Sequence, residues 1–132
     1  MIISALIARL KTVHPRVYLS VSRKHNKLPV VTVELEGSFR YRHFGTSNID
    51  TGLIESEFEI SVWGETASQV NELAESIVSN LENFSGPWVD GGSPQATQSI
   101  AGVEITSEVT GYEGKAELST YSIFVTITHT EA

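Results

Sequence analysis

Apolar residues recur every three or four positions in two stretches of the chain, and this spacing predicts two amphipathic helices. The first stretch covers residues 3–13 and ends at His14-Pro15, because the residue before a proline avoids the helical conformation. The second covers residues 70–81. Thr66 stands in position to cap its first turn, with Gln69 three residues later as the capping-box partner.

Elsewhere, apolar and polar residues alternate, which is the pattern of half-buried β-strands. This pattern predicts strands at residues 17–21, 31–36, 57–62, 103–109 and 118–127. Gly37 and Gly64 are expected to end the second and third strands, and a turn at Gly111–Gly114 is expected to join the last two.

Residues 38–53 mix aromatic, basic and turn-forming side chains. Phe39 and Tyr41 alternate with Arg40 and Arg42, as in a strand, and a stretch rich in Gly, Ser, Asn and Asp follows. The segment is longer than a hairpin turn requires. We therefore expect a long hairpin arm with a mobile tip near residues 45–52.

The remaining connection, residues 84–99, carries three glycines and two prolines and is expected to be a loop. The element order is then α-β-β-β-α-β-β. It predicts an α+β fold with a single twisted, mainly antiparallel sheet and two helices packed on one face. A chain of 132 residues, 40% of them hydrophobic, should form one domain over residues 1–132.

Composition excludes several classes of protein. The chain has no cysteine, so it has no disulfide framework, no thiolate nucleophile and no cysteine metal site. No apolar stretch approaches the roughly 20 residues of a membrane helix. The first apolar run is not expected to be a signal peptide, because Arg9 and Lys11 follow it instead of preceding it. No membrane partner is therefore expected.

Charge is divided by position along the chain. Residues 1–42 hold eight of the nine Lys and Arg residues and two acids, a charge of +6. Residues 43–132 hold Lys115 and fourteen acids, a charge of −13. The folded protein should therefore present a basic patch and a wide acidic surface, which favours interaction with partners or with other copies of the chain.

The sequence shows little catalytic or cofactor chemistry. Its four histidines have no spacing typical of a metal pair, and His129 is expected to be half-buried at a strand end. The Gly111–Lys115 run lacks the spacing and the Ser or Thr of a phosphate-binding loop, so a hairpin turn is the better interpretation. We expect no enzyme activity, no metal and no cofactor.

Glu55, Glu57 and Glu59 share one face of the third predicted strand. Three interpretations stay open: a solvated acidic face, a surface that faces DNA or a basic partner, and carboxylates for metal binding or catalysis. The first is favoured over the second, and the third is the weakest.

Contact surfaces are sought where Arg and aromatic residues gather, because protein interfaces are enriched in both. The candidates are Arg23, Lys24, Lys27, Phe39, Arg40, Tyr41, Arg42, Phe44 and Trp88. The basic loop could simply be solubilising, and one or two of the arm's aromatics could belong to the core. Trp88 either pins its Gly-rich loop to the core or is exposed for a partner.

The succession of elements resembles the tail terminator, or tail completion, proteins of long-tailed bacteriophages, including the lambda-type terminator. A short amphipathic helix precedes a strand, and a Pro-led strand over Leu28–Leu35 follows. A polar arm then leads to the acidic and apolar strand Glu57–Gly64 and to a helix with an Ala/Ser/Gln start. The chain closes on a pair of strands that includes Tyr121–Ile127.

The resemblance covers nearly the whole chain and rests on patterns of property. It implies a structural virion protein, a homo-hexameric ring that caps the tail tube, stops its growth and offers a docking face to the head connector. DNA would pass through the ring without specific binding, along a bore that Glu55, Glu57 and Glu59 could line. The location implied is the head-proximal end of the virion tail, after assembly in the host cytoplasm. Another neck or tail-tube ring component, or a small-molecule or peptide-binding α+β domain, remains as an alternative.

Overall fold

The structure is a computed structural model that describes residues 2–19, 28–42, 50–82, 84–89, 97–114 and 118–130. In chain order, its elements are α1 (Ile2–Leu10), β1 (Val17–Leu19), β2 (Val30–Arg42), β3 (Asp50–Gly64), α2 (Ala67–Leu81), β4 (Gly86–Val89), β5 (Thr97–Glu113) and β6 (Leu118–Thr130). No helix within these ranges is long and apolar enough to cross a membrane.

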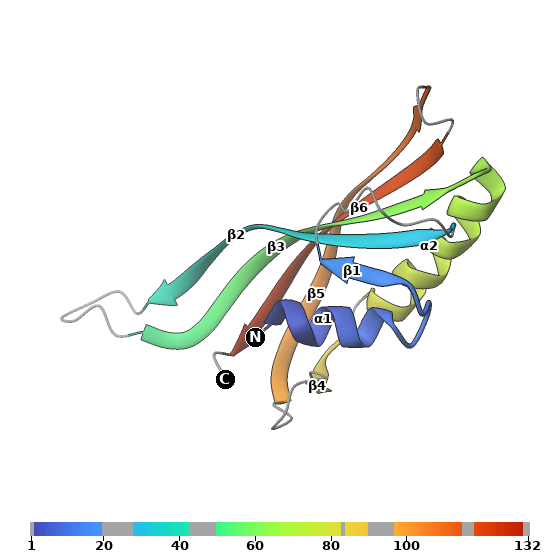
Figure 1. Cartoon of the computed structure of the whole chain (residues 1–132). Coiled ribbons are helices and arrows are strands. Elements are labelled where there is room, and N and C mark those ends of the chain that lie inside the picture. Colours follow the sequence, from blue (N-terminus) through green and yellow to red (C-terminus); the bar gives the residue numbers. More distant parts are fainter. Residues whose placement is uncertain are drawn as a thin grey trace.

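The strands form one curled, six-stranded sheet in the order β1-β2-β3-β6-β5-β4 (Figure 1). β1 runs parallel to β2, and every other neighbouring pair is antiparallel. The predicted α+β class with two helices is confirmed, but the sheet is mixed and has one strand more than expected. β6, the last strand in the chain, lies in the middle of the sheet between β3 and β5.

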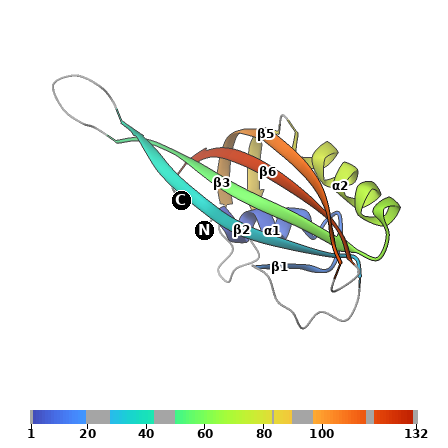
Figure 2. The same ribbon diagram turned by 90° about the horizontal axis from the view of Figure 1, so that it is seen from above.

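Both helices contribute to one hydrophobic core against the sheet (Figure 2). The strands supply alternate residues to it, such as Val31 and Val33 of β2 and Ile123 and Val125 of β6. We call this the helix side of the sheet and the opposite surface the outer face. Because neighbouring residues of a strand point to opposite faces, the intervening residues lie on the outer face.

Helix α2 agrees closely with its prediction. Val70, Ala74, Ile77 and Leu81 are buried. The amide N of Gln69 donates to Oγ1 of Thr66 at 3.1 Å, as an N-cap requires. The Gln69 side chain also accepts from the Glu65 amide at 2.9 Å, so the first turn is held from both directions.

Gly64 ends β3, as predicted, and the first turn of α2 shows why a glycine is needed there. A Cβ on Gly64 would stand 2.7 Å from Cγ1 of Val70 and 2.8 Å from Oε1 of Gln69. The flexible Gln69 side chain could move aside, but Val70 is buried in the first turn of α2, so the close approach of strand and helix depends on the missing side chain.

Several strand predictions are wrong in extent, including the third, because β3 begins at Asp50 and not at residue 57. β2 does not end at Gly37, because a register shift between Leu35 and Gly37 lets the strand continue to Arg42. The expected loop at residues 84–99 contains β4 and the start of β5. β4 begins at Gly86, whose φ of 131° is a conformation that favours glycine. The last two strands are also longer than the alternation indicated.

The first strand departs from its expected burial pattern. Val17 is buried, but Leu19 is 60% exposed although alternation places it on the same face. β1 is only three residues long and has a neighbouring strand on one side within the described part of the chain. A short edge strand of this kind has too few contacts to bury its last residue.

The expected hairpin arm is present. β2 and β3 leave the body of the sheet together as a two-stranded ribbon (Figures 1 and 2) and stay paired as far as Arg42 and Asp50. The pairing of β3 with β6 stops at Leu53 and Thr130, so the ribbon beyond this point has no third strand among the described residues. Of its expected tip, residues 45–52, the stretch 45–49 lies outside them, and residues 50–52 belong to β3.

Candidate interaction surfaces

The outer face of the sheet is acidic and polar. β3 places Glu55, Glu57 and Glu59 on it, and β5 adds Glu104 across β6. Neither helix covers this face, because both pack on the helix side. The three predicted glutamates therefore do share one surface, as the alternation in the sequence indicated.

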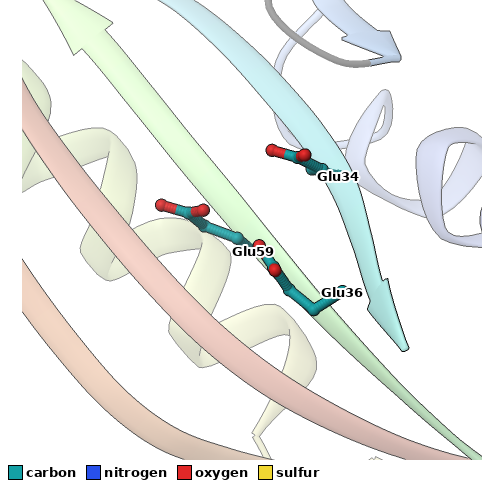
Figure 3. Close-up of side chains that lie close together, drawn as sticks. All are labelled: Glu34, Glu36 and Glu59. Carbon is teal, nitrogen blue, oxygen red and sulfur yellow. The ribbon is translucent and has the colours of Figure 1, made fainter. Parts of the chain in front are cut away.

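Two further glutamates, Glu34 and Glu36 of β2, bring their carboxylates close to that of Glu59 (Figure 3). One oxygen of each lies within 4.8 Å of the others. Like charges at this spacing repel one another, and such a group could also hold a hard cation such as Ca²⁺. Alternation around Leu35 marked both glutamates as polar positions, but their approach to Glu59 depends on strand register, which the sequence does not reveal.

The centre of the outer face is lined by the hydroxyl groups of β6. Thr120, Ser122, Thr126 and Thr128 are all half-buried and alternate with the core residues of this strand. Near one end, Thr126 and Thr128 form the floor of a hollow of about 320 Å³ that Glu55 and Glu104 flank. The face therefore offers hydroxyl and carboxylate oxygens on both sides of Phe124, which is half-buried in the middle of β6 between Glu59 and Ser107.

The basic and aromatic residues that the sequence predicts as contacts are only partly described. Arg23, Lys24, Lys27 and Phe44 lie outside the described residues. The backbone of Phe39–Arg42 belongs to β2, with Phe39 opposite Glu55 and Arg40 opposite Ile54 on β3, but the side chains of these four residues lie outside the described part. Their role as a contact surface stays a prediction.

Trp88 is buried, with 2% of its surface exposed. Its ring stacks at a tilt on Phe84, with 5.4 Å between ring centroids, and the Arg9 guanidinium lies 4.6 Å from the centroid of the Phe84 ring. The sequence left two interpretations open for Trp88. The structure agrees with the first, in which the buried side chain holds its loop against the core. Its indole N–H finds no hydrogen-bond partner in the described part of the chain.

His129 is buried, with 3% of its surface exposed, and the expectation of a half-buried edge histidine is wrong. The reason is strand order, since β6 is central and not an edge. The ring Nδ1 lies 3.1 Å from the Thr130 carbonyl oxygen, which only accepts, so Nδ1 carries the proton of the neutral ring. Nε2 then accepts from the Ser56 hydroxyl at 2.8 Å.

A serine hydrogen-bonded to a histidine can act as a nucleophile and base pair. Here Ser56 is only 1% exposed, so a substrate has no access to its hydroxyl in the folded subunit. Burial lowers the pKa of His129, although the Thr130 carbonyl offsets part of the effect. We therefore interpret the pair as a structural contact between β3 and β6.

No family model matches the sequence, and no curated protein matches it either. Among solved structures, the fold is similar to a chain of a structure described as the virion of a native gene transfer agent particle. The TM-score is 0.59 at 14% sequence identity, and the match covers 96% of this chain and 84% of that one. At this identity the likeness establishes a shared fold with a chain of that particle.

Proposed function

We propose that the protein is a structural component of a phage-like virion, and specifically the ring that caps the tail tube. The proposal combines two sources. The order of elements in the sequence resembles tail terminator proteins, and the fold is similar to that of a chain in a gene transfer agent virion. In this role, six copies would surround the DNA path at the head-proximal end of the tail.

The observation that carries the proposal is the composition of the outer face. Glu34, Glu57, Glu59 and Glu104 lie there, with Thr126 of β6 between Glu57 and Glu104. DNA carries one negative charge per phosphate and is held by proteins mainly through Lys and Arg. A bore made of this face would repel the phosphates and let DNA slide without being retained.

The proposed partners follow from the same arrangement. Other copies of the chain would form the ring, the tail tube protein would meet one rim, and the head connector the other. The arm, residues 38–53, is the candidate contact with a neighbour or with the tube. Its described part, the paired ends of β2 and β3, projects from the body (Figure 1).

Tail assembly tests the capping role directly. Purified protein is added to its tail tube protein during polymerisation, and tube lengths and tube ends are measured by electron microscopy. We expect shorter tubes, each ending in a ring of six subunits. Tubes of unchanged length without added density at their ends would overturn the proposal.

Charge reversal tests the orientation of the ring. Glu57→Lys combined with Glu104→Lys places bases on the outer face, and the matched control, Glu72→Lys with Glu82→Lys, places them on and just after α2, where both residues are exposed. If the outer face lines the bore, only the first pair should make capped tubes retain DNA at low salt. Equal retention by both pairs would mean that the bore lies elsewhere.

A different neck or tail-tube ring would share this surface and is the alternative within the same class. The measurement of tube lengths distinguishes this alternative from a capping ring, because a tube component would lengthen the tubes or enter their walls. A small-molecule or peptide-binding domain is the alternative from another class, with the hollow between Glu55 and Glu104 as its site. A subunit that remains monomeric in the presence of tube ends would favour it.

A further inference from the structure

His129 lies near the end of β6, next to the point where β2 and β3 leave the body of the sheet. The β3–β6 pairing stops one residue beyond the Ile54–His129 pair. On the other side of β6, the pair of His129 with Ile100 is the last one, and a register shift separates it from the rest of the β5–β6 pairing. Such an end of a sheet opens at a lower free-energy cost than the sheet as a whole. We call residues 53–56 of β3 and 127–130 of β6 the arm root.

The closed arm root requires a neutral His129 ring. Nδ1 carries the proton, because the Thr130 carbonyl oxygen 3.1 Å away only accepts, and Nε2 accepts from the Ser56 hydroxyl at 2.8 Å. A second proton would bind at Nε2 and remove the acceptor of the Ser56 hydroxyl. It would also place a positive charge on a ring of which only 3% is exposed. An uncompensated buried charge is costly, so the closed root resists protonation.

Within the described part of the chain, the elements around His129 supply no negative charge to compensate that proton. β3 presents Ile54 and Ser56 on the same face, and β5 presents Ile100. Helix α1, on this side of the sheet, has no titratable side chain in its first turn, residues 2–5. A protonated ring would therefore lack a counter-ion among these residues.

The charged groups near His129 either oppose its protonation or lie elsewhere. Arg40 takes a position in the same row of the sheet, opposite Ile54 on β2. The positive charge of the chain's amino terminus also disfavours a proton on the ring. Glu55 lies on the outer face, and Glu131 lies outside the described residues.

From this geometry, which is independent of the proposed function, we infer that the Ser56–His129 pair is a pH switch: it keeps the arm root closed at neutral pH, and protonation of His129 separates the end of β6 from β3. Opening brings the ring into water, where a charged imidazole is well solvated. The ribbon of β2 and β3 then loses its third strand over four more residues of β3. The arm therefore becomes longer and less restrained in acid while the rest of the sheet stays intact.

The direction of the switch follows from proton linkage. Burial lowers the pKa of His129 in the closed root, the Thr130 carbonyl offsets part of this, and the amino terminus lowers the pKa further. In the open root the pKa returns to about 6.5. Below pH 6.5 the open root therefore binds more protons, and the opening equilibrium rises by up to about tenfold per pH unit until the closed-state pKa is reached.

Hydrogen exchange of the whole chain at pH 7.5, 6.5 and 5.5 tests the switch, with each rate corrected for the intrinsic pH dependence of amide exchange. Protection of the arm root should fall by about fivefold to tenfold between pH 7.5 and 5.5. Protection in the far half of the same ladder, residues 60–63 and 120–123, should not change. Constant protection at the root would overturn the inference, and so would an equal fall in both halves, which would mean opening of the whole sheet.

Two histidine variants assign the effect. His129→Gln does not titrate, so its arm root should keep the same protection at all three pH values. His14→Gln is the matched control, because burial also lowers the pKa of His14, but its Nε2 contacts the Pro29 carbonyl beside the start of β2, at the other end of the β2–β3 ladder. This control should keep the full fall. A fall that persists in His129→Gln, or that His14→Gln abolishes, would contradict the assignment to His129.

Ser56→Ala gives a second readout if His129→Gln does not fold by circular dichroism. It removes the donor to Nε2 and weakens the closed root without removing the titrating ring. Protection of the arm root should therefore be lower than in the wild type already at pH 7.5, and the fall toward pH 5.5 should remain. Unchanged protection at pH 7.5 would overturn the role of the pair. None of these measurements involves a tail tube, so failure of the switch and failure of the capping proposal are distinguishable.

Discussion

Ser56 donates a hydrogen bond of 2.8 Å to Nε2 of His129, and both residues are buried where β3 and β6 meet. The pair lies at the root of the arm: His129 is opposite Ile54 on β3, and the β3–β6 pairing ends one residue further on. Among the residues whose side chains are described, the contact is the last buried polar link before β2 and β3 continue as a ribbon.

This contact makes stability depend on pH. Burial lowers the pKa of His129, so the folded protein binds a proton less readily than the unfolded chain, whose histidines have a pKa of about 6.5. Stability should therefore fall as the pH drops through about 6.5 toward the folded-state pKa, by up to about 1.4 kcal/mol per pH unit. Urea unfolding at pH 7.5 and pH 5.5 measures this loss.

The matched variant is His129→Gln, which keeps a polar group near Ser56 but does not titrate. It should show a smaller loss between the two pH values than the wild type. The pKa of His14 is also lowered, chiefly by burial, so a part of the loss should persist. An identical pH dependence in His129→Gln and wild type would show that His129 is not responsible.

The hydroxyl of Ser56 should matter for stability as well. Ser56→Ala leaves Nε2 of a buried histidine without its donor, and a buried polar atom that loses its partner costs about 1–3 kcal/mol. Thermal or urea unfolding of this variant gives the value. Ser122→Ala, on the half-buried outer face of β6, is the control and should cost less. Equal costs would mean that the hydrogen bond contributes little.

Helix α2 allows a comparison between two apolar residues of one stripe. Ile77 is 1% exposed, whereas Leu73 is half-buried. Ile77→Ala should lower the free energy of unfolding by about 2–5 kcal/mol, as buried truncations do, and Leu73→Ala by less. Chemical denaturation of both variants tests the order, and a larger loss for Leu73→Ala would mean that the helix is rotated relative to the sheet.

The two helices and the acidic face of β3 were predictable because their signals are local. A period of 3.6 residues around Val70 or an alternation around Glu57 depends only on the nearest residues. The gathering of Glu34, Glu36 and Glu59 was not predictable, because it requires the register between two strands. The burial of His129 was missed for the same reason, since it depends on the place of β6 in the sheet.

The three carboxylates give a prediction of their own. Glu36→Gln removes one of the crowded charges and should raise the free energy of unfolding by roughly 0.2–1 kcal/mol at low salt. The gain should vanish near 1 M salt, where the Debye screening length is only about 3 Å and the repulsion between the carboxylates is largely screened. Glu72→Gln on α2 is the control. A loss of stability in Glu36→Gln would show that the carboxylates are held together by a favourable contact.

The arm should matter for assembly and little for folding. Arg40→Ala with Arg42→Ala changes a ribbon outside the core, so the free energy of unfolding should shift by less than about 0.5 kcal/mol. Capping of tail tubes should nevertheless be impaired, as measured by tube length. Normal capping would exclude the arm as the contact, and a large loss of stability would show that it belongs to the core.

The central position of β6 has a consequence for synthesis of the chain. β3 and β5 are joined only through β6, so the sheet cannot close until residues 118–130 have left the ribosome. Up to that moment, β1, β2 and β3 can form one part of a sheet and β4 and β5 another, and each part exposes an apolar face and an open edge. Pairings between residues as distant as Leu53 and Thr130 also make folding slow. The nascent protein therefore depends on its last strand, and a chain shortened before residue 118 would be a substrate for chaperones and proteases and not a subunit.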